Sequence, residues 1–305
     1  MSYMIKPLSY VLIIVLGYVL KRAGFLKKTD QPLLSKIMLN VTLPCAIVSG
    51  FSGVQRDAGL FLISGIGLLC GFAPMLLMYL TTGSAPTRLR AYRMLNIGGS
   101  NIGCFSLPLV QAFFGSTGVV TACMFDIGNA VMMTGGSYTM TSTLLRIGGG
   151  KRDGLKEILL KFVRSAPFDT YMILLALTAL NISIPPVVCE LMQPMGGANA
   201  FLAMLIIGLV FEPAAEPALL RETARQLLCR YAFAAAAAAA CYFLTPFELG
   251  VRQVLAVLCF APVSALAPIY TERCDSDAAL SGFTNSVSIA VSLVLMMGLS
   301  MFFVA

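Results

Sequence analysis

A hydrophobic stretch in the first half of the chain contains a concentrated set of polar and helix-breaking residues. It reads NIGGSNIGCFSLP from Asn96 to Pro108. Glycine and proline weaken a helix, and Pro108 lacks a backbone N–H donor. Backbone groups that are freed at membrane depth are tolerated only against protein or a water-filled cavity. We therefore predict a broken helix beside a polar cavity, with Pro108 in the first turn of its outer half and Ser106 near the cap.

A second interruption occurs far along the chain, in the stretch FAPVSALAP from Phe260 to Pro268. Paired interruptions at corresponding positions of two halves are the best sequence pointer to a transport site. A polar patch near Asn285 lies in the last hydrophobic stretch and is a further candidate. The predicted substrate-binding residues are Asn96, Asn101, Ser106, Pro108, Pro262, Ser264 and Asn285. An alternative for Asn96 and Asn101 is interhelical hydrogen bonding, a common use of polar residues in membrane bundles.

Asp126 is the one carboxylate that the sequence places clearly within an apolar stretch. An ionisable residue there is a functional candidate by default, so Asp126 and Asn129 are predicted to couple transport to an ion. The alternative is that Asp126 is a buried acceptor for Asn129 or a serine. No Lys or Arg is expected deep in a span, so the attraction for a carboxylate substrate is assigned to half-helix N-termini, with Asn96, Asn101 and Ser106 as added donors.

Several kinds of chemistry are excluded by the composition. The chain has no His, and its nine Cys form no CxxC pair, which argues against metal sites, disulfide frameworks and intramembrane catalysis. A nucleotide-binding loop of the GxxxxGK[ST] type is also missing, which excludes ATP-driven pumping. We predict no enzyme and no cofactor. Coupling to H⁺ or Na⁺, or uniport, stays open.

The elements that must position these residues are membrane helices. Hydrophobic residues make up 58% of the chain and charged residues 11%, about half the charge of a soluble domain. A spanning helix needs roughly 20 residues. Ten spans are predicted, and the fourth stretch must contain a turn at Gly115-Ser116-Thr117. They cover residues 7–20, 37–55, 58–87, 94–125, 127–145, 170–189, 191–211, 231–247, 253–271 and 278–305.

Basic residues alternate between the gaps that separate these stretches. Eighteen of the 21 Lys and Arg fall in odd-numbered gaps, and only Lys6, Arg56 and Arg252 fall elsewhere. Basic residues accumulate on the cytoplasmic side, so both termini are predicted to be extracytoplasmic in a multi-pass protein of the plasma or inner membrane. Arg221, Arg225 and Arg230 are assigned to the cytoplasmic loop after the seventh span. The net charge of +7 is thus explained by topology and anionic lipid, not by nucleic acid.

A glycine-rich, basic segment divides the chain into two halves of five spans each. The predicted domains are residues 1–145, a cytoplasmic linker at 146–166, and residues 167–305. An odd number of spans per half gives the second half the opposite orientation. The predicted fold class is therefore an all-α membrane protein of ten transmembrane helices in two inverted repeats, with broken crossover helices at spans four and nine.

Three stretches together resemble one known family. GYVLKRAGFL from Gly17, running into LSKIMLNVTLP at 34–44, resembles the opening of auxin efflux carriers. NIGCFSLPL from Asn101 resembles their first crossover, and the stretch from Pro262 to Asp277 resembles the second. At the position four places after Pro262, where the family often has a polar residue, this chain has Leu266.

The resemblance implies a fold related to bile-acid/sodium symporters. Spans 1, 2, 6 and 7 would form a scaffold, often a homodimer interface, and spans 3–5 and 8–10 a mobile transport unit. It further implies elevator-like transport of small organic anions, with Asn101, Pro108 and Pro262 as crossover residues. We expect a secondary transporter, by efflux or exchange, of a small carboxylate. The alternatives are a sodium-coupled bile-acid-type symporter and a membrane ligand sensor that transports nothing.

Overall fold

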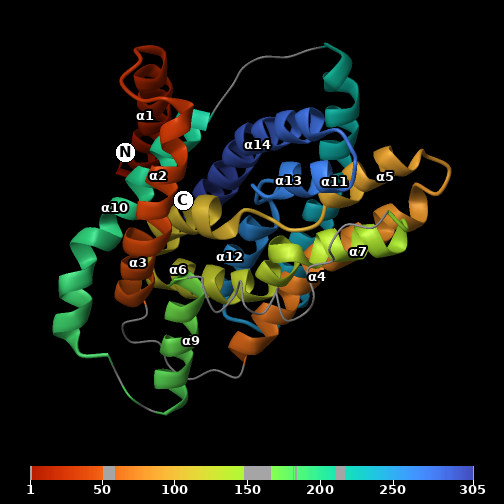
Figure 1. The fold of residues 1–305 in the computed structure, drawn as a ribbon. Coiled ribbons are helices and arrows are strands. Elements are labelled where there is room, and N and C mark those ends of the chain that lie inside the picture. The colour runs from red at the N-terminus through yellow and green to blue at the C-terminus, as the bar shows by residue number, and fades with distance from the viewer. Residues whose placement is uncertain are drawn as a thin grey trace.

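Helices are the regular secondary structure of the residues that the computed structural model of this protein describes, and one isolated β-bridge lies outside them. These residues are 2–50, 59–147, 166–180, 182, 184–210 and 217–304. Figure 1 shows the helices in order from red to blue. The α-helices are α1 (Ser2–Arg22), α2 (Gln31–Ile37), α3 (Leu43–Gly50), α4 (Gly59–Thr81), α5 (Thr87–Leu95), α6 (Leu107–Val131), α7 (Ser137–Leu144), α9 (Ala166–Ala179), α10 (Pro186–Val210), α11 (Pro217–Leu244), α12 (Leu249–Cys259), α13 (Ala267–Arg273) and α14 (Ala278–Val304). A 3-10 turn (Lys28–Asp30) precedes α2, and π turns (Met38–Thr42, Ile102–Ser106, Met132–Gly136) precede α3, α6 and α7.

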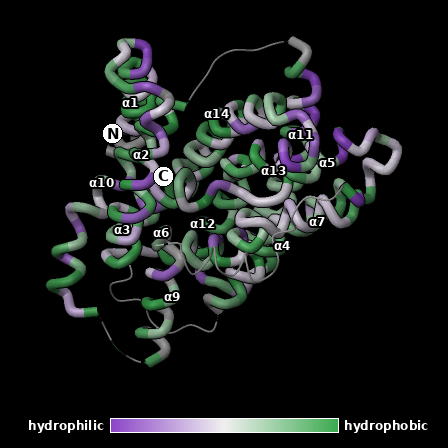
Figure 2. Tube along the Cα trace, viewed as in Figure 1, coloured by the Kyte–Doolittle hydropathy of each residue, from purple (hydrophilic) through white to green (hydrophobic). Residues whose placement is uncertain are grey.

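Six described segments are long and apolar enough to cross a membrane. Large apolar side chains such as Phe61 and Phe302 lie 71% and 76% exposed on the outside of the helices. Figure 2 shows green, which marks hydrophobic residues, along much of the outer helices. Such a surface is stable only against lipid, so the chain is a multi-pass integral membrane protein. The six segments are Gln31–Gly50, Phe61–Thr81, Ile102–Leu144, Pro186–Val210, Leu219–Leu244 and Ala278–Val304.

The longest of these segments, Ile102–Leu144, has 43 residues. At about 1.5 Å per residue it is roughly twice the thickness of the hydrocarbon layer. Gly115 interrupts it with φ 57° and ψ −134°, a conformation that favours glycine. A Cβ on Gly118 would collide with the carbonyl oxygen of Val110, which shows that the chain folds back on itself here. The turn predicted at Gly115-Ser116-Thr117 is confirmed.

Three of the ten predicted spans are not among the six segments. The span predicted at 7–20 corresponds to α1. The helix of the span predicted at 170–189 is shorter than predicted, because α9 stops at Ala179 and α10 begins at Pro186. The span predicted at 253–271 is divided between α12 and α13, of 11 and 7 residues. Most of the predicted cytoplasmic linker, residues 148–165, and Arg56 lie outside the described residues.

The helices pack in two groups. Figure 1 shows α1, α2, α3, α9 and α10 on one side and α4, α5, α7 and α11–α14 on the other, with α6 between them. Glycines allow the closest approaches: Gly17 of α1 packs on Leu205 of α10, and Gly67 of α4 packs on Phe125 of α6. Gly67 therefore serves close packing of α4 on α6. The first group meets the second where α3 and α10 contact α6.

Candidate functional site

The first predicted interruption is present between α5 and the helix that continues into α6. Helix α5 ends at Leu95 and regular helix resumes at Ile102. Gly99 has φ +80°, which few other residues adopt without strain. Pro108 lies in the first turn of α6, as predicted. Ser106 occupies the N-cap position of α6, as predicted, but its side chain makes no cap bond, and its Oγ donates to the carbonyl of Asn101 at 3.3 Å.

The second predicted interruption lies between α12, which ends at Cys259, and α13, which begins at Ala267. Pro268 occupies the first turn of α13, where its missing N–H costs no hydrogen bond. Ser264 is buried, and its Oγ accepts the N–H of Leu266 at 3.2 Å. Its hydroxyl oxygen therefore holds the turn that leads into α13.

The two interrupted segments lie against each other, although 163 residues separate them in the chain. Ser100 and Val263 form an antiparallel bridge. The N–H of Asn101 donates to the carbonyl of Pro262 at 3.0 Å. In the described part of the chain, the side chain of Asn101 makes no hydrogen bond. Two of the predicted site residues, Asn101 and Pro262, thus meet directly at this crossing.

Each member of this bridge is also held by a side chain from a helix later in the chain. Asn129 of α6 accepts the N–H of Ser100 at 2.8 Å through Oδ1 and donates to the carbonyl of Ser100 at 2.8 Å through Nδ2. Ser288 of α14 accepts the N–H of Val263 at 3.1 Å. Asp126 in turn accepts from Nδ2 of Asn129 at 2.9 Å. Asp126 therefore acts as an acceptor for Asn129, the contact that one of its two interpretations required.

Arg230 is the site residue that sequence reasoning missed, and its placement corrects two predictions. Arg230 was predicted to lie in a cytoplasmic loop, but it lies within α11, which begins at Pro217. No Lys or Arg was expected deep in a span, but Arg230 is buried among the helices at 5% exposure. Its guanidinium donates to carbonyls of both interrupted segments. The distances are 3.5 Å to Asn96, 3.1 Å to Ile97, 3.4 Å to Gly99, 2.9 Å to Ala261 and 3.1 Å to Pro262, with Ser100 Oγ at 2.8 Å.

A helical pattern in the sequence carried a signal for this burial. Thr223, Gln226 and Leu227 recur at the spacing of one helix face that leads to Arg230, and all are buried. If α11 begins at Pro217, this spacing places Arg230 on the inward face of the helix. The prediction of a cytoplasmic loop was wrong because it considered only that Arg230 is basic.

The other predicted residues lie beside the crossing with different partners. Asn96 is fully buried: it donates to the carbonyl of Tyr92 at 2.8 Å and accepts from Ser281 of α14 at 2.7 Å. The bond to Ser281 joins two helices, so Asn96 takes part in interhelical hydrogen bonding, which was the alternative to a substrate-binding role. Asn285 has a buried Oδ1 with no partner in the described residues, and its carbonyl accepts from Ser288 at 2.7 Å.

Three cavities lie near the crossing or between the helix groups. One of about 20 Å³ is lined by Ser100 and Arg230, and this volume fits one water molecule. A second, of about 570 Å³, lies between α4, α5 and α11 and shares Pro74 and Ile97 with the first. A third, of about 460 Å³, separates α3 and α10 from α6, with Gln111, Ser116, Glu190 and Gln193 in its wall.

Comparison with known proteins gives one family and one relative. Residues 3–147 match a family described as membrane transport protein. Over 148 residues the chain is 28% identical to an uncharacterized transporter of Methanothermobacter thermautotrophicus. That match covers 47% of this chain and 48% of the relative, so it spans about half of either protein. Residues 3–147, just under half of the chain, are thus similar to the membrane transport protein family, which is the auxin efflux carrier family, and the helical membrane fold agrees with that similarity.

Proposed function

We propose that the protein is a secondary transporter of a small organic anion, with the substrate held where the two interrupted helices cross. The observation that carries this proposal is the pairing of the two interruptions, through the Ser100–Val263 bridge and the Asn101 to Pro262 hydrogen bond. Unwound backbone at membrane depth is tolerated where it lines a cavity or is buried in protein. Two such segments that meet are typical of transporter binding sites.

We further propose that the chain forms ten spans in two inverted repeats, the architecture expected for this function. The contacts at the crossing are matched in pairs: Asn129 holds Ser100 as Ser288 holds Val263. Each of these two residues also lies three positions after a second polar residue of the same helix, Asp126 before Asn129 and Asn285 before Ser288. Such matching is expected if residues 1–145 and 167–305 are structural repeats on either side of a linker at 146–166.

The movement would occur between the two groups of helices. We assign α1, α2, α3, α9 and α10 to a scaffold and the remaining helices to a transport unit that slides against it. The cavity of about 460 Å³ between α10 and α6 supports this assignment, because its wall combines polar groups from both units. Gln111 Oε1 is buried there without a partner in the described residues. The exposed apolar face of α1, with Leu8 and Leu12 each 59% exposed, would meet lipid or a second copy.

Recognition of the anion is assigned to the start of the helix at Ile102. The first N–H groups of a helix lack internal partners and carry partial positive charge, which favours a carboxylate. The side chain of Asn101, which has no hydrogen-bond partner among the described residues, adjoins this end. Asp126 also approaches it, since a Cβ on Gly103 would lie 3.2 Å from Asp126 Oδ2. A negative charge on Asp126 would oppose the substrate carboxylate, so we infer that a proton on Asp126 accompanies binding.

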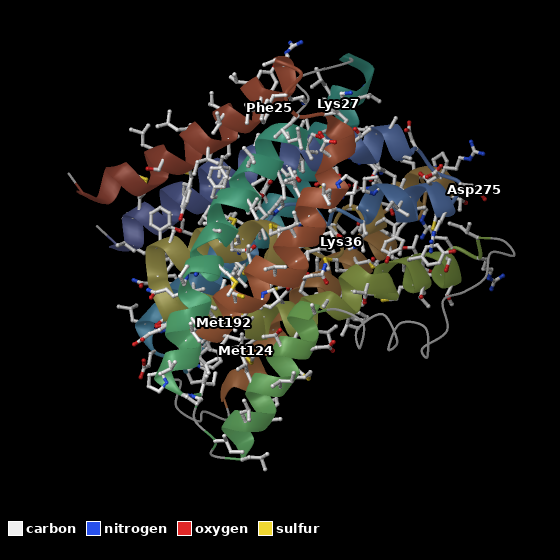
Figure 3. All side chains as sticks on the ribbon, turned by 60° about the vertical axis from the view of Figure 1, so that its left-hand side comes forward. Phe25, Lys27, Lys36, Met124, Met192 and Asp275 are labelled. Atoms are coloured by element: carbon white, nitrogen blue, oxygen red, sulfur yellow. The ribbon has the colours of Figure 1, made fainter. Side chains whose placement is uncertain are left out.

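The orientation, with both termini extracytoplasmic in the plasma or inner membrane, is also part of the proposal. Figure 3 shows Lys27 and Asp275 at the upper and right-hand edge, away from Met192 at the lower left. Under this proposal the loops after the first and ninth predicted spans, which contain Lys27 and Asp275, would both lie on the cytoplasmic side. Cysteine accessibility in whole cells, with single cysteines introduced at Lys27 and at Glu248, would test it.

A flux experiment tests the transport proposal. Purified protein is screened against organic acids by thermal shift, and the acids that stabilise it are then used in proteoliposome flux. We expect carboxylate flux that falls at least tenfold in Asn101→Ala and in Ser264→Ala, whereas Asn40→Ala, an exposed residue that binds only the carbonyl of Lys36, retains it. Unchanged flux in both site variants would refute the site assignment.

The same vesicles discriminate between the alternatives. A strict Na⁺ requirement at fixed pH would favour a sodium-coupled symporter of bile-acid type. Ligand binding without any tracer flux would favour a sensor that transports nothing. A pH-gradient response that depends on Asp126 would favour proton coupling.

A further inference from the structure

We propose that Arg230 is a built-in counter-cation: its guanidinium occupies a carbonyl site that would otherwise take a small monovalent cation. One consequence of this proposal rests on the transport function above: transport at the crossing would need no Na⁺. The placement of the guanidinium itself is independent of what the protein transports.

The acceptors around the guanidinium form an almost complete shell of oxygen atoms. Five are backbone carbonyls and one is the Ser100 hydroxyl, all within 3.5 Å of Nη1 or Nη2. Three carbonyls come from the first interruption and two from the second. Unwound carbonyls and half-helix C-terminal ends are the groups that coordinate Na⁺ in secondary transporters. The oxygen atoms around Arg230 are thus the kind of ligands that bind a small cation, and the guanidinium of Arg230 occupies their centre.

The charges at this point are balanced without a carboxylate. Helix α5 ends at Leu95 and α12 ends at Cys259, so both helices point their negative ends at Arg230. Each end carries roughly half a negative charge, and two of them offset one guanidinium. Among the described residues, no carboxylate lies within 4.0 Å of Arg230, whereas the neighbouring Arg93 pairs with Glu222 at 2.9 Å. The helix ends are therefore the counter-charge of Arg230.

The space beside Arg230 argues against a direct role in binding substrate. Its Nε is the one donor left without a partner in the described residues. The cavity at this position measures about 20 Å³, which admits one water and no carboxylate. Nη1 and Nη2 are already used by backbone oxygens. Arg230 consequently neutralises the protein's own helix ends and leaves the anion to be bound elsewhere at the crossing.

This account predicts how the protein behaves when the side chain is removed. Arg230→Ala leaves the carbonyl shell and the two negative helix ends without a cation. A small cation from solution then becomes a specific ligand of the folded state and raises its melting temperature by mass action. The wild type has no such vacancy, so replacing Na⁺ by a bulky cation should leave its melting temperature unchanged.

The experiment compares purified wild type, Arg230→Ala and Arg221→Ala in NaCl, KCl and choline chloride at equal ionic strength, with and without millimolar guanidinium. Arg221 is an exposed residue of the same helix. We expect Arg230→Ala to melt lower than wild type in choline and to recover by about 3 °C or more with Na⁺, K⁺ or guanidinium. Wild type and Arg221→Ala should not respond.

Two results would overturn the proposal. One is an Arg230→Ala protein whose melting temperature is the same in all these salts. The other is a wild type that is itself stabilised specifically by Na⁺. If Arg230→Ala does not fold, Arg230→Lys replaces it: the resident ammonium should lower stability through lost contacts without creating any cation response, and a response there would contradict the proposal. The melting temperatures are measured without any transport assay, so a failure of the proposed transport function would not change the outcome of this experiment.

Discussion

Removing the side chain of Asn129 should destabilise the protein, because this amide holds the first interruption in place. In Asn129→Ala, the N–H of Ser100 and the Oδ1 of Asp126 lose the partners that they have at 2.8 Å and 2.9 Å. The carbonyl of Ser100 keeps one bond, from the N–H of Ile102 at 3.1 Å. Two polar groups are thus left unpaired, at about 1–3 kcal/mol each.

The expected loss is about 3 kcal/mol, towards the lower end of that sum, since Ser100 is only half-buried and water can reach part of the gap. At about 2.1 cal/mol/K of unfolding entropy per residue, a loss of about 3 kcal/mol in a chain of 305 residues lowers the melting temperature by roughly 5 °C. The matched control is Asn40→Ala, which removes one exposed side chain that donates to the carbonyl of Lys36. Its expected cost is below about 0.5 kcal/mol.

The composition of the chain decides the assay. The protein has no Trp, so intrinsic tryptophan fluorescence cannot report unfolding. It has buried cysteines that form no disulfide among the described residues, such as Cys45, Cys123 and Cys241. A fluorogenic maleimide that labels thiols as they become exposed therefore follows melting in detergent. If Asn129→Ala melts within about 1 °C of Asn40→Ala, the clamp on Ser100 carries no stability and the reasoning fails.

Three further predictions test packing, electrostatics and coupling. Gly67→Leu should prevent folded protein from accumulating, since its side chain would enter the backbone of α6, whereas Gly65→Ala, with open space around its Cα, should be tolerated; size-exclusion profiles separate the two. The Arg93–Glu222 pair, at 2.9 Å and partly buried, should give a coupling energy of about 1 kcal/mol in a double-mutant cycle read by melting, and additive single variants would contradict it. Asp126→Asn should abolish the response of flux to a pH gradient while sparing substrate exchange, and a retained gradient response would exclude Asp126 as the coupling group.

Local chemistry made part of the site predictable. Gly99 requires positive φ, and Pro108 and Pro268 start helices because their missing N–H groups are not needed there. The turn at Gly115 has the same origin. These properties belong to a residue and its immediate neighbours, so the interruptions could be located by inspection.

Other properties of the site depend on which segments meet in space. The sequence by itself determined a helical membrane protein with two interrupted segments and a polar set around them. Only the tertiary structure decided that Ser100 pairs with Val263, that Asn96 bonds across helices instead of facing the crossing, and that Arg230 is enclosed by carbonyls. A lone arginine beside an apolar run is read as a loop residue, because water or a headgroup is its usual partner. Here two helix ends, brought together from distant parts of the chain, supply the negative charge that makes its burial stable.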